Sequence, residues 1–245
     1  MMQMMQMRKE SGMHGYHQFC PIAKAAEVFC QKWTPLILRD LAFGASRFSE
    51  LQRGVPLASP SLLSQRLKEL VANGVVEKRR AESGRGWVYH LTDAGREFVP
   101  MIMALGKWGR HWSPRFLPDN EADLGMLLWA IESHVNPYAF AQERTIVEVE
   151  LSDQPKRRRC WWFVNSGGEC QMCHERPDRT SDLYVTTSLK DMIRIWRGDV
   201  SLAKAMDDGR IDVHGGADLL RAFPDWLQTS PFAKIPLAMP PGPPQ

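Results

Sequence analysis

Apolar residues recur at helical spacing through the first part of the chain, between clusters of turn residues. The pattern predicts four short helices that begin at a cap or a proline: PIAKAAEVF, TPLILRDLAFG, FSELQRGV and SPSLLSQRLKELVANG. In the last helix Ser59 is the expected cap and Pro60 the first helical residue. One apolar stripe of this helix recurs at i, i+4, i+7 and i+8: Leu63, Leu67, Leu70 and Val71.

The period changes after residue 74, where VVEKRRAESGRGWVYHLT predicts two strands joined by a turn at residues 83–86. Thr92 then caps a long helix with Pro100 inside it, where we expect a kink. A helix-turn-helix followed by a basic hairpin is the winged-helix arrangement, in which a helix enters the major groove and the hairpin reaches phosphates or the minor groove. An apolar face on the long helix suits a partner subunit: Phe98, Ile102, Leu105 and Trp108.

The second half of the chain predicts an α+β arrangement. A helix over 119–135 precedes four strands, TIVEVEL, CWWFVNSGG, ECQMCHER and DLYVTTS, and short loops between consecutive strands favour an antiparallel sheet. Two helices, SLKDMIRIWRG and SLAKAMDDG, a fifth strand, RIDVHG, and a last helix, DLLRAFPDWL, follow. This order places helices over one face of the sheet. We expect a leader over 1–15 and a Pro-rich tail over 231–245, both disordered.

Charge divides the chain in the same way. The whole chain of 245 residues has a net charge of +3, but residues 1–118 carry 17 basic and 9 acidic side chains, and residues 119–245 carry 14 and 19. The first half is therefore basic by eight charges and the second acidic by five, which suggests that only the first half meets a polyanion.

Other features of the composition point to a cytoplasmic protein. An odd number of cysteines, five, fits free thiols in a reducing compartment. The N-terminus shows no secretory pattern, and no stretch is apolar enough to span a membrane, so we expect no membrane partner. The sequence contains no nucleophile-elbow, phosphate-loop or zinc-protease motif, so we predict neither an enzyme nor a bound cofactor.

The best candidates for contact with DNA lie opposite the apolar stripe and on the basic hairpin. Short hydroxyls, an amide and a cation can bond to base edges or phosphates, although an ordinary solvated helix face would present the same residues. On the helix these are Ser61, Ser64, Gln65 and Lys68, and on the hairpin Lys78, Arg79, Arg80 and Arg85. Cations are needed on the hairpin because phosphate contacts supply affinity.

The stretch CQMCH at 170–174 has the spacing of covalent haem attachment. On a strand, however, Cys170, Met172 and His174 face one side and Cys173 the other, so the two thiols cannot hold one ligand. A closed zinc site would also need a second pair of ligands. We therefore expect no metal or haem here, and we interpret this segment as a sheet strand.

These residues in this order resemble an HxlR-type winged helix-turn-helix regulator over about 16–115. The matching pieces are CP-I, KWT-LILRDL, RFSEL, SP-LLSQRLKEL, GVVEKR and YHLTDAGRE. The resemblance implies a dimeric transcription factor whose SPSLLSQRLKEL helix binds double-stranded DNA, with Arg47 and Arg85 as phosphate contacts. It also suggests oxidant sensing at Cys20, where a helix N-terminus favours thiolate, against the alternative of a small buried residue. A pair of Cys20 with Cys30 would depart from the family pattern.

The run DLYVTTSLKDMIRIWRGDVSLAKAMDDGRIDVHG resembles a sterol carrier protein type 2-like domain over about 120–228. The resemblance implies a cavity for a hydrophobic small molecule, although a fully packed core would use the same side chains. The candidate lining residues are Trp161, Phe163, Leu183, Val185, Ile193, Trp196, Leu202 and Met206.

Together these observations predict a winged-helix DNA-binding and dimerisation domain over 16–118 and a sterol-carrier-like domain over 119–230. The expected function is a sequence-specific transcriptional regulator that forms a homodimer and responds to a hydrophobic effector. The alternative is a lipid or small-molecule carrier whose winged helix serves assembly. A steep loss of DNA affinity with added salt distinguishes the first from the second.

Overall fold

The computed structural model describes residues 15–82, 84–112 and 122–238. The predicted leader, except for its last residue, and the end of the predicted tail lie outside these ranges. The chain forms two compact units, residues 1–102 and 103–245. The division falls inside the long helix, so the last turns of that helix group with the second unit. The domain boundary expected near residue 118 stays a prediction, because it falls in a stretch that is not described.

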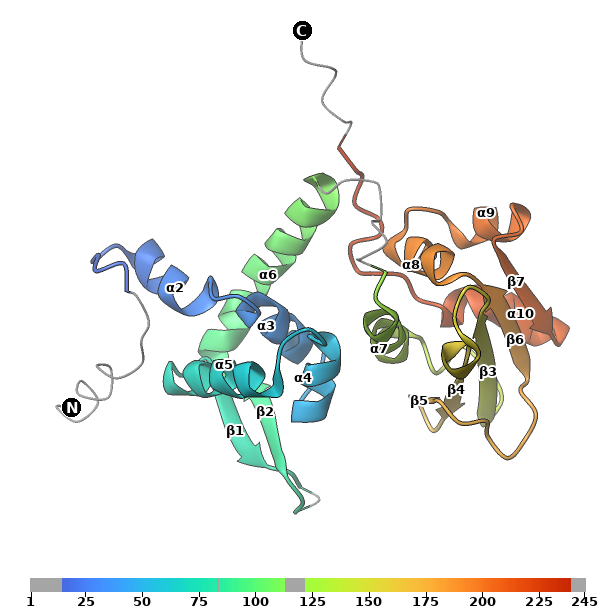
Figure 1. Cartoon of the computed structure of the whole chain (residues 1–245), viewed down its shortest axis with the longest axis horizontal. Coiled ribbons are helices and arrows are strands. Elements are labelled where there is room, and N and C mark those ends of the chain that lie inside the picture. Colours follow the sequence, from blue (N-terminus) through green and yellow to red (C-terminus); the bar gives the residue numbers. More distant parts are fainter. Residues whose placement is uncertain (1–14, 83, 113–121, 239–245) are drawn as a thin grey trace, which may run out of the picture. The chain divides into compact units, whose positions relative to one another are not determined.

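The first unit consists of short helices and one hairpin (Figure 1). Its elements are α2 Pro21–Phe29, α3 Thr34–Ala42, α4 Phe48–Gly54, α5 Pro60–Ala72, β1 Val76–Arg80, β2 Trp87–Leu91 and α6 Asp93–Trp112, whose end extends into the second unit. Two predicted caps are confirmed: Ser59 Oγ accepts a hydrogen bond from the Leu62 N–H at 3.2 Å, and Thr92 Oγ1 accepts one from the Gly95 N–H at 3.2 Å. Each cap satisfies a backbone donor that the first turn of a helix leaves unpaired. The cap predicted at Thr34 is wrong, because Thr34 is the first residue of α3 and Trp33 occupies the cap position.

The core of this unit lies where α5 packs on the other helices. Leu63, Leu67 and Leu70 are buried among residues of α3, α4 and the hairpin. Val71, which we expected in the same stripe, is 36% exposed. At 3.6 residues per turn, residue i+8 is rotated by about 80° from residue i, and this rotation carries Val71 to the edge of the buried face.

The second unit is built on a five-stranded sheet with the order β5-β4-β3-β6-β7. Its strands are β3 Arg144–Leu151, β4 Cys160–Ser166, β5 Glu169–Cys173, β6 Leu183–Thr187 and β7 Ile211–Gly215. Its helices are α7 Leu124–His134, α8 Leu189–Arg197, α9 Leu202–Asp207, α10 Ala217–Trp226 and the short 3-10 helix η3 Lys156–Arg158. The strands and helices follow the predicted segments, except that α7 starts five residues later than predicted.

The sheet is mixed, and the prediction of an antiparallel sheet is wrong at one pairing. Strands β3 and β6 are parallel, with Val149 opposite Val185, and the other pairs are antiparallel. The reason lies in the connection over 174–182, which does not form a hairpin. The Ile146 N–H donates to Asp182 Oδ2 at 2.8 Å, and the Asp182 N–H donates to the Ile146 carbonyl at 2.9 Å. These bonds start β6 beside the beginning of β3, so both strands run the same way.

Alternation along the strands gives the sheet a covered and an open face. Val147, Val149, Phe163 and Val185 are buried in one apolar cluster with residues of α7, α8 and α10. Glu148, between the two valines, points to the opposite face, where its Oε2 accepts a hydrogen bond from Trp162 Nε1 at 3.1 Å. A period-2 pattern predicts this arrangement, and the helices cover one face as expected.

Strand β5 places the residues of CQMCH on alternating sides, as predicted. Cys170 and Met172 pack against the apolar cluster, while Cys173 lies opposite Trp162, on the other face. Burial raises the pKa of the Cys170 thiol to about 12, which disfavours the thiolate that metals and haem chemistry require. His174 lies beyond the end of β5 and is exposed.

The segment 231–238, which we expected to be disordered, is folded against the second unit. It forms a turn in which the Ile235 N–H donates to the Phe232 carbonyl at 3.0 Å, and the Ala238 N–H donates to the His111 carbonyl at 2.7 Å. Composition misled the prediction because prolines do not prevent neighbouring residues from donating such bonds. Among the described residues, no helix combines the length and the apolar character needed to cross a lipid bilayer.

Candidate nucleic-acid interface

The turn between α4 and α5 is held by one amide side chain. Gln52 Nε2 donates to the Ala58 carbonyl at 2.7 Å and to the Val55 carbonyl at 3.3 Å. The Ala58 N–H also donates to the Val55 carbonyl at 3.0 Å. These bonds fix the direction in which α5 leaves the turn, which matters because a helix can contact base edges only at a defined angle to the groove.

Behind the turn, Asp40 of α3 is buried beside Gly54 at the end of α4. Arg39 Nε donates to Asp40 Oδ1 at 2.7 Å, and Arg39 Nη2 donates to the Gly54 carbonyl at 3.0 Å. Desolvation nevertheless raises the pKa of Asp40 to about 6, because burial opposes ionisation more strongly than Arg39 favours it. Asp40 Oδ2 is buried without a hydrogen-bond partner. It fills the space that a side chain at Gly54 would need, since a Cβ there would lie 1.9 Å from it.

Helix α5 presents the predicted polar residues on its outer side. Ser61, Gln65 and Lys68 are exposed, and Ser64 is half-buried. Ser61 Oγ lies 3.0 Å from Ser59 Oγ, and Gln65 Nε2 donates to Glu69 Oε1 at 2.9 Å. The structure therefore brings these four side chains together along one helix. To donate a hydrogen bond to a base, the Gln65 amide would have to break its hydrogen bond to Glu69.

The hairpin sorts its cations onto two faces. Arg79 forms an ion pair with Glu77 at 2.6 Å, on the face that also carries His90. Lys78 and Arg80 point to the other face, opposite Tyr89 and Trp87. From the sequence alone, the three cations were predicted to have the same role. In the structure, Arg79 shares a face with its partner Glu77, whereas Lys78 and Arg80 lie on the opposite face.

Trp87 is a surface feature that the sequence-based argument missed. The Lys78 Nζ lies 4.7 Å from the centre of the Trp87 ring, and the Arg80 guanidinium carbon lies 4.6 Å from it. The ring is 45% exposed. Alternation along VEKRR and WVYHL, once their pairing is known, would have indicated that these three residues share one face.

Arg47 and Arg85, the two predicted phosphate contacts, both lie close to the hairpin in sequence or in space. Arg47 is exposed at the start of α4 and forms an isolated antiparallel bridge with Val88 of β2. Arg85 is exposed in the turn between β1 and β2. One cation thus lies at the side of the hairpin and the other at its tip.

Cys20 and Cys30 lie at opposite ends of α2. Cys20 is the half-buried residue before the helix, and Cys30 is the exposed residue after it. Ten residues of helix span about 15 Å. A disulfide requires Cα atoms less than about 7 Å apart, so the two thiols of one chain cannot pair while α2 is intact.

In the second unit, the predicted lining residues lie in the apolar cluster or against it, with one exception. Phe163, Leu183, Val185 and Ile193 belong to the buried cluster, and Trp161, Trp196 and Leu202 pack against it, partly buried. Met206 is 40% exposed on α9. The family resemblance implied that Met206 faces inward, but α9 is six residues long and buries only Ala205 fully.

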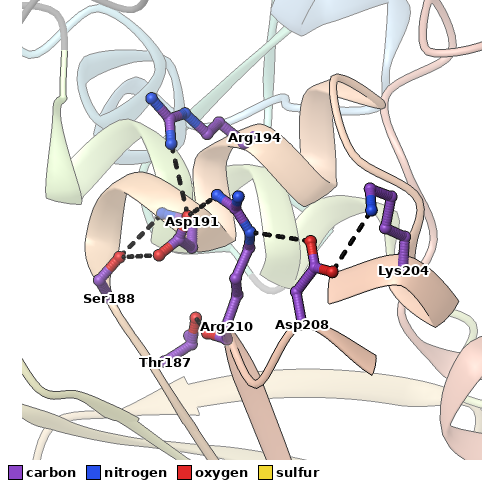
Figure 2. Close-up of polar contacts among 7 residues, drawn as sticks. All are labelled: Thr187, Ser188, Asp191, Arg194, Lys204, Asp208 and Arg210. Atoms are coloured by element: carbon purple, nitrogen blue, oxygen red, sulfur yellow. Dashed lines mark hydrogen bonds and ion pairs between the residues drawn. The ribbon is translucent and has the colours of Figure 1, made fainter. Parts of the chain in front are cut away.

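A polar network joins α8, α9 and β7 at the edge of this cluster (Figure 2). Arg210 lies between Asp191 and Asp208, with Nη1 3.4 Å from Asp191 Oδ1 and Nε 3.3 Å from Asp208 Oδ2. Lys204 Nζ lies 3.3 Å from Asp208 Oδ1. Ser188 caps α8 by accepting from the Asp191 N–H at 3.0 Å. The charged side chains of this network pair with one another, so we interpret the network as support for the turn after α9.

Comparison with known proteins finds relatives that match most of the first unit and all of α6. The HxlR-like helix-turn-helix family model matches residues 28–116. The HTH-type transcriptional regulator YvaP of Bacillus subtilis, itself uncharacterized, is 37% identical over 103 residues, which are 41% of this chain and 95% of that protein. An HTH-type regulator of Mycobacterium tuberculosis is 37% identical over 95 residues, and the chain spans 60% of its length.

Among solved structures, PA1607, a proposed transcription factor, is 31% identical with a TM-score of 0.39. The match covers 67% of this chain and 97% of that one. The sequence identity of 37% with YvaP extends over 95% of that protein, which is sufficient to assign the family. The chain belongs to the HxlR-like helix-turn-helix family.

Proposed function

We propose that this protein is a sequence-specific DNA-binding transcriptional regulator in which α5 enters the major groove and the β1–β2 hairpin contacts the backbone. The observation that carries the proposal is the division of α5 into two faces. Leu63, Leu67 and Leu70 are buried, while Ser61, Gln65 and Lys68 remain exposed on a helix fixed by the Gln52 turn. Its relatives, named as HTH-type transcriptional regulators, support the same conclusion.

Each proposed contact has a distinct role. Ser61 and Ser64, in the first turns of α5, can donate to phosphates or base edges, and Gln65 can form paired bonds to adenine. Lys68, Lys78, Arg80 and Arg85 bind phosphates, together with Arg47 beside the hairpin. Arg79 contributes less because it already pairs with Glu77. Phosphate contacts give affinity on any sequence, whereas contacts with base edges, above all the paired bonds of Gln65, give the preference for one sequence.

A salt titration tests the proposal. Each phosphate contact releases counterions, so the logarithm of the affinity falls with the logarithm of salt concentration by about 0.9 per contact. We expect a steep slope for the whole chain on the DNA upstream of its own gene, and tighter binding there than on an unrelated duplex of equal length. Weak binding that does not change with salt would contradict the proposal and favour the carrier alternative.

A second experiment tests the choice of helix. The double variant Gln65→Ala with Lys68→Ala should bind both duplexes with nearly equal affinity, because Gln65 is the residue proposed to form paired bonds to a base and most of the remaining contacts go to the backbone. Lys156→Ala, which removes an exposed cation of the acidic half, is the matched control and should keep the preference. A preference retained by the double variant would show that another element contacts the bases.

We also propose that two copies pair through α6. Two residues of the face predicted to meet a partner, Phe98 and Ile102, are instead buried in the core of the first unit. The exposed apolar side chains of α6 recur at i, i+4, i+7 and i+11 and are 51 to 67% exposed: Met101, Leu105, Trp108 and Trp112. Exposed apolar side chains along one helix face mark protein contacts, and a second copy is the partner that a symmetric DNA site requires.

For the second unit we propose a sterol-carrier-like domain that binds a hydrophobic effector between sheet and helices. Support comes from the large side chains that meet in one cluster and from the partial exposure of Trp161, Trp196 and Leu202 beside it. Native mass spectrometry of freshly purified protein should detect a bound apolar small molecule. Addition of that molecule should change the affinity for DNA, because an effector acts only if it binds two states unequally. Protein that carries no such molecule would contradict this proposal.

Oxidant sensing at Cys20 is a separate proposal. The half-buried Cys20 thiol stands directly before the first residue of α2, and Lys24 follows one turn later. Brief peroxide treatment should lower the affinity of the protein for DNA, and Cys20→Ser should remove that response. Cys30→Ser is the control, because an effect carried by Cys30 would survive in the Cys20 variant.

A further inference from the structure

One face of the hairpin packs on the core at its base, through Val76 and Leu91, and carries an aromatic ring outside the core towards its turn. Trp87 lies outside the apolar cluster of the first unit and is 45% exposed. Exposure of a large indole costs solvation free energy, whereas Tyr89 on the same face is partly buried against the cluster. The ring therefore has its partners outside the core.

Those partners are two cations. Lys78 Nζ and the Arg80 guanidinium lie 4.7 and 4.6 Å from the centre of the Trp87 ring, and Lys78 is also 5.8 Å from the ring centre of Tyr89. The residues that the pairing places on this face are Val76, Lys78, Arg80, Trp87, Tyr89 and Leu91, none of them acidic. We define Lys78, Arg80 and Trp87 as the cation–indole patch.

Unlike an ion pair, the cation–indole patch keeps its net positive charge. On the opposite face Glu77 neutralises Arg79 at 2.6 Å. A ring attracts a cation through its quadrupole but carries no net charge, so Lys78 and Arg80 are held in place with their full charge. Ordering the two long side chains in advance also reduces the entropy lost when they bind a ligand.

The structure thus presents two positive charges held against one indole ring that is 45% exposed. A strand of DNA presents the complement, since phosphates alternate with deoxyribose rings along its backbone. We propose that the cation–indole patch binds the backbone of double-stranded DNA, with the Trp87 ring packed on a deoxyribose and the two cations on the flanking phosphates. This inference rests on the proposed function, because it names a further contact of the same interface.

Trp87→Val tests the inference, since valine retains strand propensity and removes only the ring. Binding is measured by fluorescence anisotropy of full-length protein on two labelled duplexes, the DNA upstream of its gene and a mixed-sequence duplex, over a salt series. We expect an affinity about tenfold lower on both duplexes at every salt concentration, because the contact is with sugar and ordered cations. The salt slope should not change, because both cations remain.

Two comparisons separate a DNA contact from support of the hairpin. Lys78→Ala should reduce the slope by about 0.9, the value for one phosphate. Trp87→Phe, which keeps a smaller ring, should restore part of the affinity lost in the valine variant. Tyr138→Ala, which removes an aromatic side chain 78% exposed in the second unit, is the control and should bind like the native protein.

The possible results are distinguishable. Native protein that binds without dependence on salt would refute the proposed function itself. Native protein that binds with a steep slope, together with a valine variant of equal affinity, would refute the role of Trp87 alone. A valine variant that loses both affinity and several units of slope would also refute it, because the ring would then act only by holding the hairpin in place.

Discussion

At the scale of single residues, a buried carboxyl group makes the stability of the first unit depend on pH. Asp40 has no exposed surface, and burial raises its pKa to about 6, whereas in the unfolded chain it titrates near 4. Protonation is therefore easier in the folded state. The stability that this group contributes is complete below pH 4 and is lost as the pH rises through about 6.

Asp40→Asn should remove this dependence. The native protein should lose about 3 kcal/mol relative to the variant between pH 4 and pH 7, since each pKa unit corresponds to about 1.4 kcal/mol. Urea unfolding of both proteins at several pH values gives the difference, in which the titration of other carboxyl groups cancels. A difference that stays constant across this range would mean that Arg39 keeps Asp40 ionised throughout.

Gly54, beside Asp40, should tolerate no side chain. A Cβ at this position would lie 1.9 Å from Asp40 Oδ2, and the carboxyl group cannot move away because Arg39 and the core surround it. Gly54→Ala should lower the free energy of unfolding by about 1–3 kcal/mol, the usual cost of overpacking. Thermal unfolding of the variant measures this loss.

The cause can be assigned with a double-mutant cycle. If the contact with Asp40 is responsible, the combination of Gly54→Ala with Asp40→Ala should be destabilised by less than the sum of the single changes. Exact additivity would place the cause elsewhere, for example in the backbone of α4.

At the scale of elements, α6 combines a buried start with an apolar face open to solvent. Leu105→Glu should convert a dimer into a monomer, because a carboxylate would be buried without a partner at the centre of the proposed contact. The change should affect the fold of each subunit little, since Leu105 is 55% exposed. Sedimentation velocity at equal concentrations measures the outcome.

The control for this experiment lies on the same helix. Lys107 is exposed, but it is rotated by about 200° from Leu105, so Lys107→Glu should leave the association unchanged. A native protein that sediments as a monomer, or a Leu105 variant that remains a dimer, would contradict the assignment of α6.

Features that depend on neighbouring residues in the chain were predictable from the sequence, whereas features that depend on residues far apart in the chain were not. Ser59 and Thr92 marked the starts of α5 and α6 because a cap is decided by neighbouring residues. The parallel pairing of β3 with β6 depends on Asp182 bonding to Ile146, 36 residues earlier, and no local pattern contains that information. For the same reason Lys78 and Arg79 were predicted to have equal roles, although the strand pairing places them on opposite faces of the hairpin.

At the scale of the whole molecule, the two units differ in the sign of their net charge and have separate apolar cores. Residues 1–102 carry 14 basic and 9 acidic side chains, a net charge of +5, whereas residues 103–245 carry 17 and 19, a net charge of −2, so DNA attracts the first unit more strongly than the second. Each unit also buries an apolar cluster whose members come almost entirely from its own residues.

Two separate cores predict two unfolding transitions, because cooperativity requires shared packing and single-domain behaviour fails for chains of this kind. Leu67 is 1% exposed in the first cluster and Phe163 is fully buried in the second. Differential scanning calorimetry should show two transitions in the native protein. Leu67→Ala should lower the midpoint of only one, and Phe163→Ala that of only the other, each by a loss of about 2–5 kcal/mol. If both variants lowered one common transition, the two units would form a single cooperative core, and an effector bound to the second unit would then stabilise the DNA-binding unit directly.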